Sequence, residues 1–162
     1  MSPGGQFRAS LDMCRLPNGK RHSHQRRIPS ALLREIDRRL QTVASDLAGT
    51  QDFSALLGIV EREIGQIHGV GELTVYDVAH RVGAFLGKAP ALVYLHRGTR
   101  EGARHLGFMG KAIDPRMLPP AFNKLTPAEV EDCLCIYKAE LHGAPSNLKK
   151  RCGQTSPQRS RC

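Results

Sequence analysis

One short glycine-rich segment, Ile67-His68-Gly69-Val70-Gly71, most constrains how this chain can fold. Apolar residues recur at helical spacing on both sides of it, from Phe53 to Ile64 and from Val75 to Leu86. Gly69 and Gly71 have no Cβ and can adopt a positive φ, so the chain can reverse direction within a few residues. The pattern predicts two amphipathic helices joined by a tight hairpin over residues 53–86.

Further helix signals lie before and after this pair. An apolar stripe follows Pro29 and predicts a helix over about residues 30–44. Pro90 predicts the start of a short helix through Leu95, although residues 91–95 are also the best strand candidate in the chain. A further short segment is expected from Gly98 to Gly107, followed by an irregular connection over 108–124.

The last expected helix has the strongest start signal. Thr126 is followed by Pro127 and, three residues after the cap, by Glu129, which is the pattern of a capping box. The helix is expected to end at Gly143. Its buried face would be formed by Val130, Leu134, Tyr137 and Leu141.

Together these segments predict a compact all-α domain over residues 30–142. The basic arm 1–29 and the basic tail 143–162 are poor in apolar residues, and we expect both to be disordered. No apolar run reaches the roughly 20 residues that cross a bilayer, and the N-terminal residues do not resemble a secretion signal. We therefore expect a cytoplasmic protein without a membrane partner, with its five cysteines reduced.

The charge favours a polyanionic partner. The chain has 24 Lys/Arg and 15 Asp/Glu, a formal net charge of +9. Residues 1–40 carry +6 and residues 141–162 carry +5, while 81–111 is the one basic stretch inside folded-looking sequence, at +5. Aromatic residues make up only 5% and Trp is absent, so a stacking surface for single-stranded bases is poorly supplied. The basic side chains of the stretch are Arg81, Lys88, Arg97, Arg100, Arg104 and Lys111.

The hairpin resembles that of the helix-hairpin-helix (HhH) family of DNA-binding motifs, over about 25 to 30 residues. Ile67, Gly69, Val70 and Gly71 match the motif, and Ala79 is a candidate for its small inner position. The resemblance implies sequence-independent binding of a nucleic-acid backbone. The wider chain resembles small bacterial proteins of uncharacterised role, which implies no function.

The residues themselves support phosphate binding. Glycines let successive amides approach a phosphate closely, Val70 would anchor the turn in the core, and the first turn of the next helix adds N–H donors and the positive end of its dipole. Such a site contacts phosphate and ignores base identity. Glu72 directly follows, and its carboxylate would repel a phosphate. A plain tight turn between packed helices is the alternative interpretation.

Residues 95–103 have the outline of a second hairpin, with Thr99 in place of the second glycine. A simple loop is the favoured interpretation. If the segment paired with the first hairpin, Gly98, Thr99 and Arg100 would hold a second phosphate.

Base-excision glycosylases that resemble endonuclease III also carry this hairpin, so the chain could share their activity if it had their catalytic residues. The position of their catalytic Lys is Leu73 here, and residues 88–92, where their Asp would fall, contain no carboxylate. We therefore expect no glycosylase activity and no catalytic residue. An enzyme of unfamiliar type, with a polar pocket near His80, His96 or His105, stays open.

Cysteine and histidine supply ligand types that zinc accepts, but their spacing does not indicate a site. We expect no metal and no cofactor. Cys-x-Cys on a helix places the two thiols about 200° apart, which hinders chelation. The candidates are Cys14, His22, His24, Cys133 and Cys135.

The predicted function is non-enzymatic, non-sequence-specific binding of nucleic acid, DNA more than RNA. The predicted contacts are Gly69, Val70, Gly71, Arg81, Lys88, Arg97, Arg100 and Arg104. The alternatives are a helical module that binds a protein partner, an RNA-binding protein, and an enzyme of unrecognised type.

Overall fold

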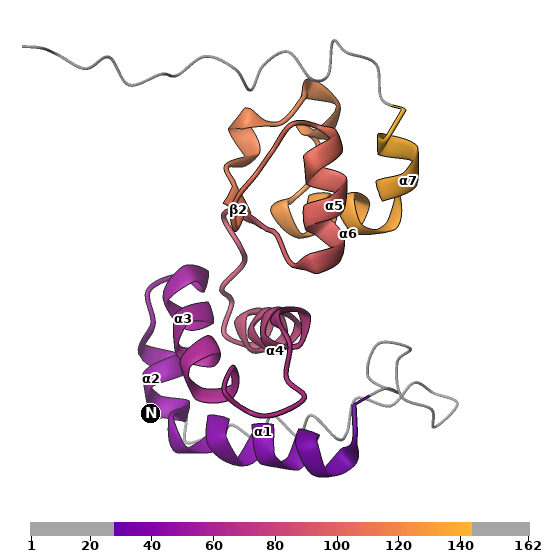
Figure 1. Cartoon of the computed structure of the whole chain (residues 1–162). Coiled ribbons are helices and arrows are strands. Elements are labelled where there is room, and N and C mark those ends of the chain that lie inside the picture. The colour runs from indigo at the N-terminus through magenta and orange to yellow at the C-terminus, as the bar shows by residue number, and fades with distance from the viewer. Residues whose placement is uncertain (1–27, 144–162) are drawn as a thin grey trace, which may run out of the picture. The chain divides into compact units, whose positions relative to one another are not determined.

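The computed structural model describes residues 28–143 (Figure 1). These residues form seven α-helices and one sheet of two short strands, which confirms the expectation of a mainly helical protein. The expected disorder of the two ends concerns residues that lie almost entirely outside the described range.

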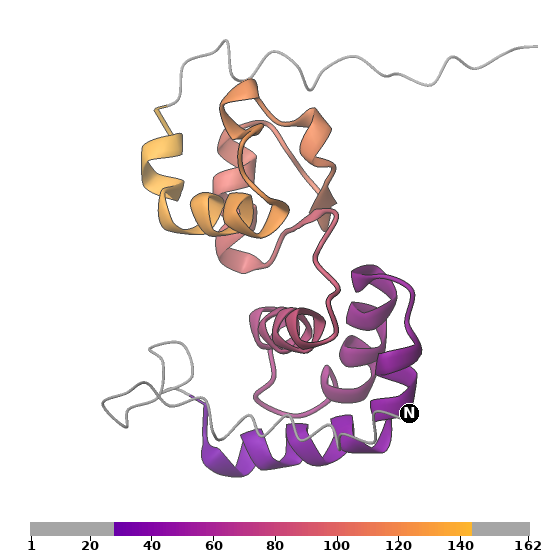
Figure 2. The same ribbon diagram turned by 180° about the vertical axis from the view of Figure 1, so that it is seen from behind.

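Two compact units divide the chain, residues 1–89 and 90–162. The residues 30–142 that were expected to form one domain are therefore shared between two units. In Figures 1 and 2 the first unit runs from indigo to magenta and the second from rose to yellow.

The first unit is a packed set of four helices, α1 (Ser30–Thr42), α2 (Ala44–Gly49), α3 (Phe53–Ile64) and α4 (Glu72–Phe85). The predicted helices at 30–44 and 53–64 are confirmed within two residues. Asp52 caps α3 by accepting a hydrogen bond from the Ala55 N–H at 2.8 Å. The apolar stripe of α3 is buried as its spacing predicts, and α3 packs on α1, α2 and α4.

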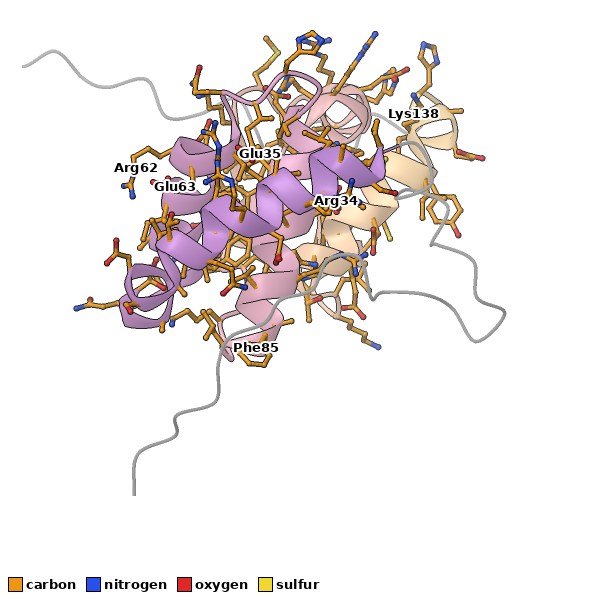
Figure 3. The ribbon with its side chains drawn as sticks, turned by 90° about the horizontal axis from the view of Figure 1, so that it is seen from below. Arg34, Glu35, Arg62, Glu63, Phe85 and Lys138 are labelled. Carbon is orange, nitrogen blue, oxygen red and sulfur yellow. The ribbon has the colours of Figure 1, made fainter. Side chains whose placement is uncertain are left out.

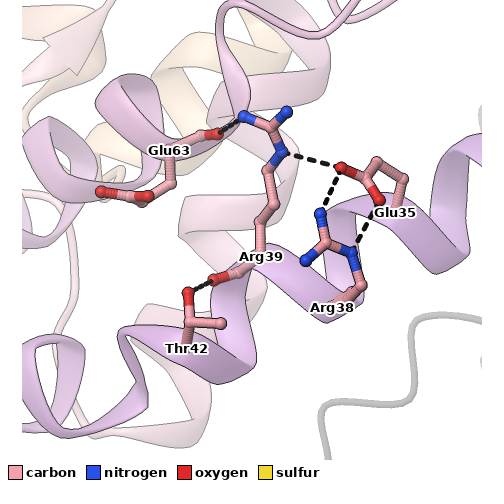
Figure 4. Close-up of polar contacts among 5 residues, drawn as sticks. All are labelled: Glu35, Arg38, Arg39, Thr42 and Glu63. Carbon is pink, nitrogen blue, oxygen red and sulfur yellow. Dashed lines mark hydrogen bonds and ion pairs between the residues drawn. The ribbon is translucent and has the colours of Figure 1, made fainter.

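Polar contacts on the surface tie α1 to α3 (Figure 4). The Glu35 carboxylate accepts hydrogen bonds from Arg38 and Arg39, and Arg39 also donates to the carbonyl of Glu63 at 3.2 Å. The two guanidinium groups lower the pKa of Glu35 to about 2. Both ion pairs of Glu35 lie within α1, while the bond from Arg39 links the last turn of α1 to the last turn of α3; Figure 3 labels Glu35 and Glu63 on these two helices.

The second unit holds α5 (Arg97–His105), α6 (Pro127–Ile136) and α7 (Lys138–Leu141), with the strands β1 (Val93–Tyr94) and β2 (Ala112–Ile113). Two 3-10 turns, Pro115–Met117 and Pro120–Phe122, lie in the connection that was expected to be irregular.

The prediction of a short helix after Pro90 is wrong. Val93 and Tyr94 instead pair in antiparallel register with Ile113 and Ala112. Val93 is fully buried in the core of this unit, and the partner strand that satisfies its backbone lies about twenty residues further on in the chain.

The helix start at Thr126 is confirmed, with both hydrogen bonds of the capping box present. The prediction of a single helix as far as Gly143 is wrong, because the backbone leaves helical geometry at Tyr137. Tyr137 is 54% exposed rather than buried, and α7 begins directly after it. Leu141 still packs against the core cluster from α7.

Candidate nucleic-acid interface

The hairpin between α3 and α4 is closed by short backbone hydrogen bonds. The Gly65 N–H donates to Glu61 at 2.8 Å, Ile67 donates to Ile64 at 3.0 Å, and Val70 donates to Ile67 at 3.0 Å. Gly69 has φ +89°, a conformation that L side chains rarely adopt. The glycine at this position is thus required by the backbone.

The base of the hairpin rests on α1. A Cβ built on Gly69 would lie 3.3 Å from the Leu32 Cδ2 atom. Val70, which was expected to anchor the turn in the core, is half-buried. Ala79, the candidate for the small inner position, is fully buried.

Gly71 leads directly into α4. It is the N-cap residue with φ −105° and ψ 173°, an extended conformation, so Gly69 is the one of the two hairpin glycines that adopts a positive φ. No side chain caps α4, and a Cβ built on Gly71 would meet nothing within 4 Å. The first helical bond runs from the Val75 N–H to the Gly71 carbonyl at 3.0 Å. Amides that precede such a bond have no acceptor within the helix, and the space at the Cβ position of Gly71 beside them is open.

Glu72 occupies the first turn of α4 and is exposed. A carboxylate here stabilises the helix through its dipole. It also opposes any anion that approaches the same amides, by about 1 kcal/mol at 4 Å in water.

Two of the predicted basic residues belong to the same unit as the hairpin. Arg81 is exposed on α4. Lys88 is half-buried, and its ammonium donates to the Ala48 carbonyl near the end of α2 at 3.0 Å. Lys88 therefore has a structural contact in addition to its charge.

The other three predicted residues lie on α5 in the second unit. Arg97 and Arg104 are exposed and stand seven residues apart, so they share one face of the helix. Arg100 is half-buried and donates to the Leu95 carbonyl at 2.9 Å. The predicted contacts thus form two groups, one in each unit.

The second hairpin outlined by the sequence is not present. Residue 93 begins a strand rather than a helix, and Gly98 and Thr99 lie inside the first turn of α5. Thr99 is fully buried. The favoured interpretation of a loop is also corrected, since α5 begins at Arg97.

The charge of the described residues is close to balanced. Residues 28–89 contain six Lys/Arg and eight Asp/Glu, a net charge of −2, and residues 90–143 contain seven and six, a net charge of +1. Residues 1–27 and 144–162 carry +5 each. Long-range attraction for a polyanion therefore comes from the two ends of the chain.

The second unit holds a buried polar cluster around His96, one of the three histidines that the sequence offered as neighbours of a polar pocket; the cluster itself was not predicted. His96 is 5% exposed, Thr99 0% and Glu131 7%. His96 Nε2 pairs with the Glu131 carboxylate, and the Thr99 hydroxyl lies 2.7 Å from the same nitrogen and donates to Glu131 at 3.0 Å. The one signal available was a carboxylate at 131, directly beside the apolar stripe of α6.

This cluster does not activate the Thr99 hydroxyl as a nucleophile. In a hydroxyl–imidazole–carboxylate triad the hydroxyl and the carboxylate contact opposite ring nitrogens. Here both contact Nε2. The cluster instead fixes the orientation of the His96 ring.

No family model, no curated protein and no solved structure matches the chain. Among residues 28–143, no three His, Cys, Asp or Glu side chains are grouped so that they could hold a metal ion. The candidate ligands Cys14, His22 and His24 lie outside the described residues. None of the helices described has both the length and the apolar character needed to span a membrane.

Proposed function

We propose that this protein binds the backbone of nucleic acid, DNA in preference to RNA, without recognising base sequence. The observation that carries the proposal is the uncapped N-terminus of α4 beside Gly71, where a side chain would meet open space. Glycine geometry and helix amides in this arrangement can bind phosphate oxygens. The resemblance of residues 67–71 to the HhH hairpin supports the same function.

The distribution of charge gives the hairpin and the two ends of the chain different roles in this proposal. The first unit carries −2 over its described residues, so the hairpin adds few attractive charges of its own. The basic ends supply most of the attraction, and the hairpin fixes where one phosphate lies. Arg81, about 15 Å further along α4, would contact a different phosphate. Binding of this kind weakens steeply with salt, because each neutralised phosphate releases counterions.

The direct test is fluorescence anisotropy of a labelled 20-base-pair duplex titrated with the full chain at increasing salt. We expect binding at 50 mM salt and a linear fall of log K against log salt. Absence of binding at 50 mM salt contradicts the proposal. Competition with a structured RNA of equal length then measures the preference between the two polymers.

A matched pair of variants tests the hairpin itself. Gly71→Asp and Gly71→Asn add side chains of equal size at a position with open space, and both residues are good N-caps, so both variants should fold. Only Asp adds a negative charge beside the amides. We expect the Asp variant to bind about tenfold more weakly than the Asn variant at 50 mM salt. If both variants bind as tightly as the natural chain, the hairpin does not contact phosphate.

A further inference from the structure

Two histidines of the second unit meet at the ends of neighbouring helices. The ring centroids of His105 and His142 are 4.9 Å apart, and the ring planes cross at 71°. His105 is the last residue of α5, and His142 directly follows α7 as its C-cap residue. These two helices pack side by side (Figures 1 and 2). Two imidazoles from distant parts of the sequence are thus brought together.

An ion pair one helical turn earlier holds the same two segments together. The Lys138 ammonium donates to the Glu101 carboxylate at 2.5 Å, and this bond lowers the pKa of Glu101. Glu101 precedes His105 by four residues, and Lys138 precedes His142 by four. Residues four apart lie on one face of a helix, so the ion pair and the histidine pair are successive contacts between the same two faces. Leu141 anchors α7 in the core cluster beside them.

The nitrogen atoms of the two rings are not engaged by other side chains or by the backbone. Among residues 28–143, neither ring takes part in a hydrogen bond, and the contact of each ring with the other is its one ring contact. His105 is half-buried and His142 is exposed. They differ in this from His96, whose Nε2 pairs with the buried Glu131 carboxylate. Imidazole nitrogens of this kind can bind a metal ion.

The separation of the rings matches two ligands of one metal ion. Zn²⁺ binds an imidazole nitrogen at about 2.0–2.1 Å, which puts the ion about 3 Å from the ring centroid. Two rings on a tetrahedral ion then have centroids about 5 Å apart. The observed separation is 4.9 Å. Because His142 is exposed, its ring can turn toward a point shared with His105 without displacing packed side chains.

We propose that His105 and His142 form a two-histidine site for a divalent transition-metal ion that takes imidazole ligands, of which Zn²⁺ is the type. In the described part of the chain no third His, Cys, Asp or Glu completes a group around the pair, so water fills the other positions of the ion. The bound ion joins the end of α5 to the end of α7 and stabilises the second unit. Mg²⁺ and Ca²⁺ prefer oxygen ligands and do not bind here.

The first test is thermal unfolding of the full chain, followed by circular dichroism, with Zn²⁺ or Mg²⁺ added under reducing conditions. An ion that binds only the folded state raises the melting temperature. We expect about 100 μM Zn²⁺ to raise it by about 2–4 °C and Mg²⁺ to leave it unchanged. His105→Gln and His142→Gln should each remove this increase.

His68→Gln is the matched control, because His68 is exposed in the hairpin of the first unit. It removes one imidazole from the folded and the unfolded chain alike and should keep the full increase with Zn²⁺. No increase in the natural chain, or an equal increase in all three variants, overturns the proposal.

The second test needs no variant and so does not depend on whether the substituted chains fold. Diethyl pyrocarbonate modifies accessible imidazole nitrogens, and a bound ion protects them. With Zn²⁺ at about ten times its dissociation constant, modification of His105 and His142, located by peptide mass, should slow about tenfold. His68 should react at an unchanged rate, and Mg²⁺ should protect neither ring. Equal effects of Zn²⁺ on all three histidines, or none on the pair, overturn the proposal.

Discussion

Gly102 of α5 and Leu134 of α6 meet backbone to backbone. A Cβ built on Gly102 would lie 2.1 Å from the Leu134 carbonyl oxygen and 2.9 Å from its carbonyl carbon. A main-chain atom cannot move aside as a flexible side chain can. The packing of α5 on α6 therefore requires glycine at position 102.

Gly102→Ala is expected to destabilise the second unit by about 3 kcal/mol, since the added methyl group forces the two helices apart. Urea unfolding followed by circular dichroism measures the loss. A variant as stable as the natural chain would show that the helices separate without penalty.

Gly58→Ala is the matched change at a glycine with room. Gly58 is exposed in α3 and a Cβ there meets nothing within 4 Å. We expect the free energy of unfolding to rise by about 0.5–1 kcal/mol, because Ala favours a helix interior over Gly by this amount. A fall in stability would contradict the open space at this position.

Thr126→Ala removes the capping box of α6. The Thr126 hydroxyl accepts from the Glu129 N–H at 3.3 Å and donates to the Glu129 carboxylate at 2.8 Å. We expect a loss of about 1 kcal/mol in thermal unfolding. Thr126→Ser keeps the hydroxyl and should retain most of the stability. Equal losses in both variants would assign the effect to the methyl group instead.

Acid should remove the contribution of Glu35. Its pKa is lowered to about 2 by Arg38 and Arg39, below the unfolded value of about 4.3. A group with a lowered pKa in the folded state stabilises the fold above its unfolded pKa and loses this effect as the pH falls toward 2. Melting temperatures of the natural chain and of Glu35→Gln should therefore differ at pH 6 and converge near pH 2. A difference that does not change with pH would contradict the ion pairs.

Removing the carboxylate at the start of α4 should strengthen nucleic-acid binding. Glu72→Gln is expected to raise the affinity for a DNA duplex about fivefold at 50 mM salt, since it removes a repulsion of about 1 kcal/mol. Asp46→Asn on α2 makes the same change in net charge away from the hairpin and is the control. Equal gains in both variants would mean that only net charge matters.

Local signals in the sequence predicted local structure well. Asp52, the stripe of α3 and the Thr126 box each act within one turn of their own helix, so neighbouring residues suffice to place these elements. The pairing of Val93 with Ile113 and the contact of His96 with Glu131 each join residues at least twenty positions apart. No periodicity in one segment carries that information.

The candidate interface follows the same division. The positive φ of Gly69 could be predicted from its neighbours, because the turn is local. The basic stretch 81–111 appeared continuous in sequence, yet its members are shared between two units and two of them bind carbonyl groups. The boundary between the two units decides which basic residues belong with the hairpin. A count of charges along the sequence does not reveal that boundary.

The glycines of α5 also define a sequence pattern that could identify proteins related to this one. Gly98 and Gly102 stand one helical turn apart, the first against a sulfur and the second against a carbonyl oxygen of α6. A substitution at either position requires the opposite helix to shift, a demand that the packing does not place on the exposed side chains of α5. Descendants of a common ancestor should therefore retain this glycine pair and the Thr-Pro-x-Glu start of α6 after most other positions have drifted.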